Sequence, residues 1–191
     1  AGTVQMHAGQ NFVFGGGPTS GSAASNLDMD SGAQVTSAGG DITLTSPYSF
    51  FLSIVDAASG TAIVTGDSDG DGVGIIHDNL AGEAANVTGS AAVIRSATGI
   101  GTPGNDINTS VSTLAASNTT SNHINISNDV SGLLTIGTVD GLSGVTNAAA
   151  AGTVNVSNAS PLTVDDDVSA SGDVTLTATD DASDGPGDED D

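Results

Sequence analysis

Alternating apolar residues that return at a short, fixed spacing predict that this chain folds as an all-β parallel β-helix (β-solenoid) with coils of roughly twenty residues. Three segments begin with glycine, at Gly132, Gly152 and Gly172, and each carries apolar residues two and four positions later. Such alternation is typical of a strand that buries one of its faces. The composition agrees, because the abundant Asp, Asn, Ser, Thr and Gly are turn-forming residues and poor helix formers.

The same template recurs along most of the chain. Gly40 and Gly60 again start twenty residues apart, and the distance from Gly2 to Gly40 is close to two such periods. Asn122 replaces the glycine only ten residues before Gly132, so we expect those two strands on different faces of one coil. Coils of this length predict about nine coils in all. The residues expected to point inward are Val4, Met6, Ile42, Leu44, Ala62, Val64, Ile124, Ile126, Leu134, Ile136, Val154, Val156, Val174 and Leu176.

Between the template strands, apolar segments alternate with turn-forming ones. In chain order we expect a short strand and a turn-rich loop over 11–21, an Asp/Gly loop over 66–79, strand character over 86–100, a loop over 99–105, a strand over 111–116, and an acidic tail or connector over 180–191. Residues 47–55 are the most apolar stretch. Residues 1–179 would then form one solenoid domain. The alternative fold is a tandem of immunoglobulin-like β-sandwiches, which would place turn signals about every 8–12 residues without a twenty-residue period.

The charge of the chain excludes several classes of partner. One Lys or Arg stands against 23 acidic residues, for a net charge of −22. Arg95 alone cannot neutralise a nucleic-acid backbone or an anionic membrane surface.

There is no cysteine for disulfides or thiolate metal sites, and no apolar run approaches the roughly 18 residues that a membrane-spanning helix needs. Since the chain starts at Ala1, we expect a processed protein or a piece of a longer one.

Two segments, Gly40-Asp-Ile-Thr-Leu-Thr and Gly172-Asp-Val-Thr-Leu-Thr, are nearly identical, and Ala97-Thr-Gly-Ile-Gly is of the same kind. These segments resemble the repeats of giant bacterial exoproteins of the filamentous-haemagglutinin and β-strand-repeat adhesin type. The resemblance covers most of residues 27–181. It implies a right-handed parallel β-helix, secretion, and a structural or adhesive role within a very long chain. The N-terminal secretion domain of such proteins is not in this sequence.

The sharpest local motif is a candidate calcium site in the Asp/Gly loop. With Asp67 as position 1, carboxylates of Asp67, Asp69, Asp71 and Asp78 fall at positions 1, 3, 5 and 12, and the Val73 carbonyl can join them. The spacing resembles dockerin and thrombospondin type-3 loops, although position 12 is Asp rather than Glu. Four carboxylates so close together repel one another unless a cation lies among them. The alternative readings are a solvated acidic turn and an adaptation of the whole chain to high salt.

No residue pattern predicts an enzyme. The three histidines, His7, His77 and His123, lack metal-binding spacing, and no G-x-S-x-G motif marks a nucleophile. β-Helical enzymes of the pectin-lyase type use several basic residues, whereas this chain has one. Six Asn-x-Ser/Thr sequences offer either glycosylation sites or asparagine ladders along the solenoid, at Asn86, Asn108, Asn118, Asn125, Asn155 and Asn158.

All the aromatic residues lie near the N-terminus. Phe12, Phe14, Tyr48, Phe50 and Phe51 either fill and cap the first coils or form an apolar surface for assembly. Because no dedicated cap is evident, we expect a non-enzymatic extracellular or cell-surface unit that assembles into a filament, sheath or adhesin. Its partners would be copies of itself or flanking repeats, with surface glycans as further candidates and calcium as the stabilising ion. The alternative is a soluble secreted β-helix that binds or cleaves polysaccharide.

Overall fold

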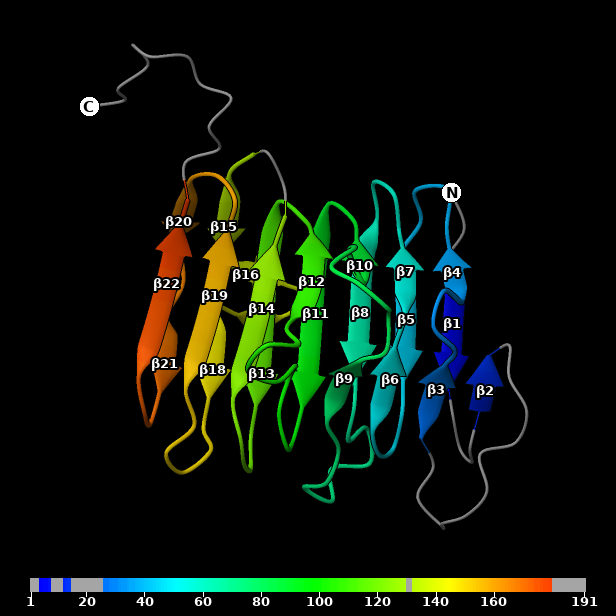
Figure 1. The fold of residues 1–191 in the computed structure, drawn as a ribbon, viewed down its shortest axis with the longest axis horizontal. Coiled ribbons are helices and arrows are strands. Elements are labelled where there is room, and N and C mark those ends of the chain that lie inside the picture. The colour runs from blue at the N-terminus through cyan, green and yellow to red at the C-terminus, as the bar shows by residue number, and fades with distance from the viewer. Residues whose placement is uncertain (1–3, 8–11, 15–25, 130–131, 180–191) are drawn as a thin grey trace.

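Parallel β-strands wound into stacked coils make up the molecule (Figure 1). The computed structural model describes residues 4–7, 12–14, 26–129 and 132–179, so the predicted tail over 180–191 lies outside the described residues. Within these ranges every regular element is a strand, and no helix is present that could cross a membrane. The all-β prediction is confirmed.

Two facing sheets contain most of the strands. Sheet A consists, in spatial order, of β1 (Val4–His7), β5 (Ile42–Thr45), β8 (Thr61–Thr65), β11 (Ala91–Ser96), β13 (Thr113–Asn118), β15 (Leu134–Ile136) and β20 (Leu162–Val164), with β18 (Val145–Asn147) beside β13 and β21 (Val168–Ala170) beside β18. Sheet B consists of β4 (Gln34–Thr36), β7 (Ile54–Asp56), β10 (Val87–Thr88), β12 (Ile107–Ser110), β14 (Ile124–Asn128), β19 (Val154–Asn158) and β22 (Val174–Ala178).

A shorter row of strands extends sheet B beside its first coils. It contains β2 (Phe12–Phe14), β3 (Leu27–Met29), β6 (Phe50–Leu52) and β9 (Ile76–Asp78). Single bridges from Ile76 to Ile100 and from Ile100 to Ile124 connect this row to β14. In Figure 1 the strands of sheet B run upward in front, those of sheet A run downward behind, and each later coil lies further to the left. The chain therefore winds as a right-handed coil.

The register of the strands identifies the fold as a parallel β-helix. Ile42 pairs with Ala62 and Val154 pairs with Val174, so both of these twenty-residue spacings separate neighbouring coils. Every pairing between coils is parallel. Immunoglobulin-like sandwiches are built from antiparallel strands, and the alternative fold was therefore wrong.

The coil length is less uniform than the sequence predicts. Leu134 pairs with Leu162 in sheet A, whereas Val154 pairs with Ile124 in sheet B, so the spacing from Gly132 to Gly152 does not mark neighbouring coils. Val4 pairs directly with Ile42, so this interval separates neighbouring strands of sheet A instead of spanning two periods there, although β2 and β3 within it stack on each other in the shorter row. Loops inserted at the turns lengthen several coils, and sheet B consequently has seven strands in the described part of the chain, fewer than the nine coils predicted.

Inward-facing side chains form one continuous core between the sheets. Ile42, Leu44, Ile124 and Ile126 are at most 1 % exposed, as are the other predicted inward residues from Ala62 to Val156. Burial of each such aliphatic side chain contributes about 1.5–3 kcal/mol. The glycine before a template strand has a steric reason, since a Cβ on Gly60 would lie 2.5 Å from the carbonyl oxygen of Gly40 in the preceding coil.

A second, smaller cluster lies on the outer face of sheet A. Val93 and Ala115 are fully buried there under the antiparallel hairpin of β16 (Thr138–Val139) and β17 (Leu142–Ser143). Asp140 and Gly141 form the tip of the hairpin with φ of 47° and 73°, as a type I′ turn requires. Arg95, the only Lys or Arg of the chain, holds this tip by donating to the Asp140 carbonyl at 3.2 Å and by lying 3.7 Å from its carboxylate.

Candidate functional site

The acidic loop between β8 and β9 brings three of the predicted calcium ligands together. Asp67, Asp69 and Asp71 each offer a carboxylate oxygen, and these oxygens lie within 4.8 Å of one another. Positive φ values at Gly70 and Gly72, 74° and 85°, allow the backbone to turn this tightly. Asp69 and Asp71 are exposed and Asp67 is half-buried, so the cluster faces solvent.

Hydrogen bonds inside the loop fix two of these carboxylates. Asp67 Oδ1 accepts from the Gly72 N–H at 3.1 Å, and Asp71 Oδ1 accepts from the Val73 N–H at 2.9 Å. Burial raises the pKa of Asp67, and the neighbouring Asp71 carboxylate acts in the same direction. Three clustered carboxylates provide hard oxygen ligands of the kind that Ca²⁺ prefers, and a bound cation would remove their mutual repulsion.

Asp78 does not join this cluster. The chain extends into β9 after Ile75, and Asp78 at the end of that strand accepts at Oδ1 from the Leu80 N–H at 2.8 Å and from Asn86 Nδ2 at 2.6 Å. The expected position-12 ligand therefore stabilises the next turn instead. Val73 is 39 % exposed at the rim of the loop. The structure thus supports a three-carboxylate cluster rather than a complete twelve-residue calcium loop.

The aromatic residues have different environments. Phe50 is fully buried in the core. Phe51 points to the outside of the same strand and stacks on His77, with ring centroids 5.1 Å apart and an interplanar angle of 17°. Burial lowers the pKa of His77. Tyr48 is half-buried, and its carbonyl oxygen accepts from the Asp67 N–H at 3.1 Å. The structure places Phe12 and Phe14 on β2, beside β3, without describing their side chains.

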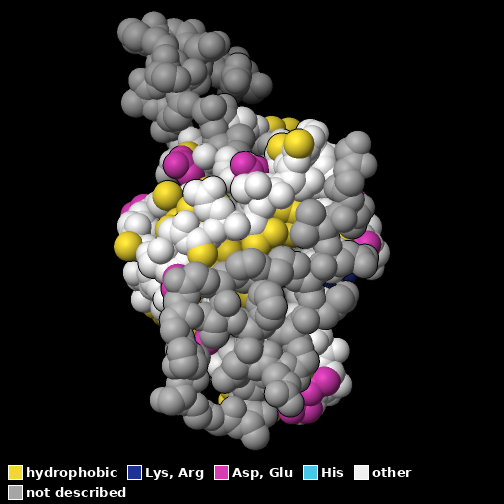
Figure 2. All heavy atoms as spheres, turned by 90° about the vertical axis from the view of Figure 1, so that its right-hand side faces the viewer, with side chains coloured by type: hydrophobic (Ala, Val, Ile, Leu, Met, Phe, Trp, Pro, Cys, Tyr) yellow, Lys and Arg dark blue, Asp and Glu magenta, His cyan; other side chains and the backbone are white. Residues whose placement is uncertain are grey.

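The last coil exposes two core positions that are buried in each preceding coil for which side-chain burial is described. Val164 and Val174 are 45 % and 43 % exposed, whereas their partners in the preceding coil, Ile136 and Val154, are fully buried. Among the described residues no strand pairs with the outer edges of β20, β21 and β22. Figure 2 views the opposite, N-terminal end and shows hydrophobic side chains across the middle of that face as well, with carboxylates near its margin.

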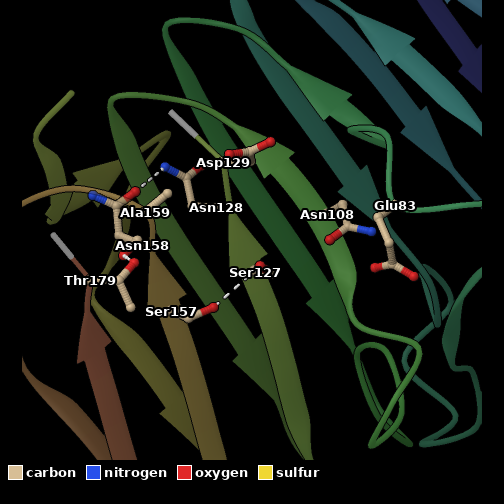
Figure 3. A pocket seen from close by; sticks show the side chains of 9 residues that line it. All are labelled: Glu83, Asn108, Ser127, Asn128, Asp129, Ser157, Asn158, Ala159 and Thr179. Carbon is tan, nitrogen blue, oxygen red and sulfur yellow. Dashed lines mark hydrogen bonds between the residues drawn. The ribbon is translucent and has the colours of Figure 1, made fainter. Parts of the chain in front are cut away.

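Buried asparagines form ladders between successive coils. Asn128 Nδ2 donates to Asn158 Oδ1 at 2.9 Å (Figure 3), and Asn118 Nδ2 donates to Asn147 Oδ1 at 2.9 Å. Of the six asparagines in Asn-x-Ser/Thr sequences, all except the half-buried Asn155 are at most 6 % exposed. The side-chain amides of five of them make hydrogen bonds inside the folded chain, as the ladder alternative predicts: Asn86, Asn118, Asn125, Asn155 and Asn158.

No protein-family model, curated protein or solved structure matches this chain. The resemblance to exoprotein repeats consequently stays a prediction made from the sequence. The fold, the acidic loop and the open last coil are the observations on which a function can be argued.

Proposed function

We propose that this protein is a non-enzymatic structural unit of an extracellular filament, sheath or surface adhesin, and that it works by assembly along the axis of its β-helix. The observation that carries the proposal is the open last coil. Val164 and Val174 continue the core ladders of sheets A and B, yet they are nearly half exposed. Solenoid proteins that act alone cover such ends with a polar cap.

The geometry of a parallel β-helix makes its two ends complementary. Each internal coil pairs on both sides with a coil running in the same direction. The edge of β22 therefore offers the pattern of backbone groups that β19 offers to β22, and β1 and β4, which end the two sheets among the described residues, have the matching edge. A contact between unlike ends does not close on itself, so repeated stacking generates a fibre. Flanking repeats of the same chain would use the same edges covalently.

Calcium is the proposed stabilising ion. The carboxylates of Asp67, Asp69 and Asp71 lie close together, the Arg95 side chain is engaged with Asp140 instead, and the whole chain carries a net charge of −22. Self-repulsion of this size destabilises a compact fold and opposes the approach of a second copy. Divalent cations would reduce both effects.

Structural roles of the histidines favour a non-enzymatic protein. His77 stacks on Phe51, and His123 Nδ1 accepts a hydrogen bond from the Thr153 N–H at 3.1 Å. Both imidazoles are thus held by contacts within the coil stack. An extracellular location follows from the proposed role in a sheath or adhesin.

The test is the size of the purified chain, measured by analytical ultracentrifugation and negative-stain microscopy with and without millimolar Ca²⁺. We expect concentration-dependent rods in Ca²⁺. Val174→Lys places a charge at the exposed end and should abolish them, whereas the control Leu133→Lys, at a residue that is 49 % exposed in the preceding coil just before β15, should not. A monomer at high concentration in Ca²⁺ would contradict non-covalent assembly.

A further inference from the structure

A polar groove runs over the outer face of sheet B near its C-terminal end (Figure 3). It consists of two adjoining hollows, of about 240 Å³ and 140 Å³, that share Ser157. The larger is lined by Glu83, Asn108, Ser127, Asn128, Asp129, Ser157, Asn158, Ala159 and Thr179. The smaller adds side chains that include Asp106, Asn155, Thr175 and Thr177.

The floor and the wall of the groove come from different elements. Outward side chains of neighbouring coils form the floor, where Ser157 Oγ donates to Ser127 Oγ at 3.2 Å and Thr177 stands opposite Ser157 in β22. The wall is the pair of loops that carry Glu83 and Asp106, residues 79–86 and 101–106.

Hydrogen bonds hold the loop that carries Asp106 in place. Thr102 and Asn105 exchange two backbone hydrogen bonds of 3.0 and 2.9 Å, and Asn105 Nδ2 donates to the Asp78 carbonyl at 3.2 Å. Burial raises the pKa of Asp106, and the charge of Glu83 adds to this effect. The groove is therefore pre-formed, with two carboxylates near one side.

One buried donor at the foot of the wall lacks a partner. Asn125 is 3 % exposed, and its Oδ1 accepts from Asn155 Nδ2 at 3.0 Å, but its own Nδ2 makes no hydrogen bond among the described residues. The loop that carries Asp106 packs directly above, since a Cβ on Gly101 would lie 2.6 Å from the Asn125 carbonyl oxygen and 3.2 Å from the Asp106 Cα. An unsatisfied buried donor is destabilising. Asn125 lies beneath the lining side chains, since Asn155 and Asp106 line the smaller hollow and Asn125 does not.

We propose that this groove binds an uncharged, hydroxyl-rich oligosaccharide. A sugar hydroxyl donates to carboxylates such as those of Glu83 and Asp106, and it also accepts from an amide donor such as that of Asn108, which lines the larger hollow. The serine and threonine hydroxyls of the floor can act in either sense.

Charged ligands fit the groove less well. An anionic chain would meet Glu83, Asp106 and Asp129 with no Lys, Arg or His among the lining residues. A cation would interact favourably with the carboxylates, but it offers no hydrogen-bond acceptor to the N–H donors that line the groove. The binding of a neutral sugar does not depend on assembly, so this site can exist whether or not the proposed filament forms.

The experiment is a titration of the whole chain with neutral hexasaccharides (maltohexaose, cellohexaose and chitohexaose), followed by NMR amide shifts and calorimetry. We expect saturable shifts at Ser157, Thr177 and Asp106 with at least one of these sugars, and little change in affinity between low and high NaCl because the ligand is uncharged. The double variant Ser157→Ala/Thr177→Val should bind about tenfold more weakly. Thr163→Val, another exposed strand threonine in the last coil, is the matched control and should bind normally.

Three results would overturn the proposal. The first is an absence of groove shifts at millimolar concentrations of all three sugars. The second is binding of poly-lysine at the groove, with steep salt dependence and no sugar binding, which would identify an electrostatic surface. The third is equal loss of affinity in the Thr163→Val control. The shift map of the unmodified protein decides the first two even if a variant fails to fold.

Discussion

Asn128 has one of the fullest sets of hydrogen bonds among the described side chains. At the end of β14 it accepts from Thr109 Oγ1 at 2.8 Å and from the Val111 N–H at 3.0 Å, and it donates to the Val111 carbonyl and to Asn158 Oδ1. It is 1 % exposed. The amide therefore connects three successive coils at a position where an aliphatic side chain could not satisfy the backbone of the turn.

Replacement of Asn128 by alanine should be among the more damaging single changes. Buried partners on both neighbouring coils would lose their hydrogen bonds, at about 1–3 kcal/mol for a buried group left unsatisfied. For a chain of this size each 1 kcal/mol lowers the Tm by about 2–4 °C. Thermal unfolding measures the effect. The control Asn105→Ala removes a single exposed hydrogen bond and should change the Tm little, so equal losses in the two variants would contradict the role of the ladder.

His77 should make the protein less stable in mild acid. Its pKa is lower in the folded chain than its ordinary value of 6.5, so the unfolded chain takes up the proton first as the pH falls. Stability contributed by the neutral ring is present above 6.5 and is lost as the pH drops through the lowered folded pKa. His77→Phe keeps a ring stacked on Phe51 and should flatten the curve of unfolding free energy against pH below 6.5. An unchanged curve would exclude this source of acid sensitivity.

At the scale of elements, the acidic loop determines the response to calcium. A site bound only in the folded state stabilises it by about 2.7 kcal/mol when the free ion is at 100 times its Kd. We therefore expect the Tm in millimolar Ca²⁺ to exceed that in EGTA. Asp69→Asn should reduce the difference, and the exposed Asp173→Asn should not. If NaCl or KCl raises the Tm as much as Ca²⁺ does, general charge screening explains the acidity instead.

The strands were largely predictable because their alternation of inward apolar and outward polar residues is visible directly in the sequence. The pairing of strands was less so, since it depends on turn lengths that vary from coil to coil. Leu134 and Val154 belong to different sheets although they match the same template. Asp78 matches the spacing of a calcium ligand, but β9 begins before it and draws it away from the cluster.

The hairpin of β16 and β17 had a signal in the sequence that the search for a twenty-residue period did not use. The Asp140-Gly141 pair between Val139 and Leu142 is a typical hairpin signal, and Ile63 and Val93, out of phase with the template, are the residues that meet this hairpin. The groove on sheet B could not be read from spacing. Its wall and floor come from loops and strands of several coils, and only the register places Asp106 near Asn155.

At the scale of the whole molecule, the coil stack has open apolar edges at the end where β22 lies. These open edges support assembly from copies of the chain or continuation by further repeats. Comparison of Val174→Lys with Leu133→Lys distinguishes assembly at this end from general insolubility. The net charge of −22 makes the ionic conditions part of that experiment, because like-charged rods repel at low salt.

The hydrogen bonds between coils also run along the axis of the rod, which determines how the molecule resists force. A pull on the two chain ends loads one coil at a time, so the strands peel from an end instead of shearing together. Detachment of the coil between Val154 and Val174 releases twenty residues, or about 70 Å of extended chain, whereas the thirty residues between Ile124 and Val154 release about 100 Å. Under tension the rod would lengthen in unequal steps that follow its registers, and each coil would act as a separate extensible element.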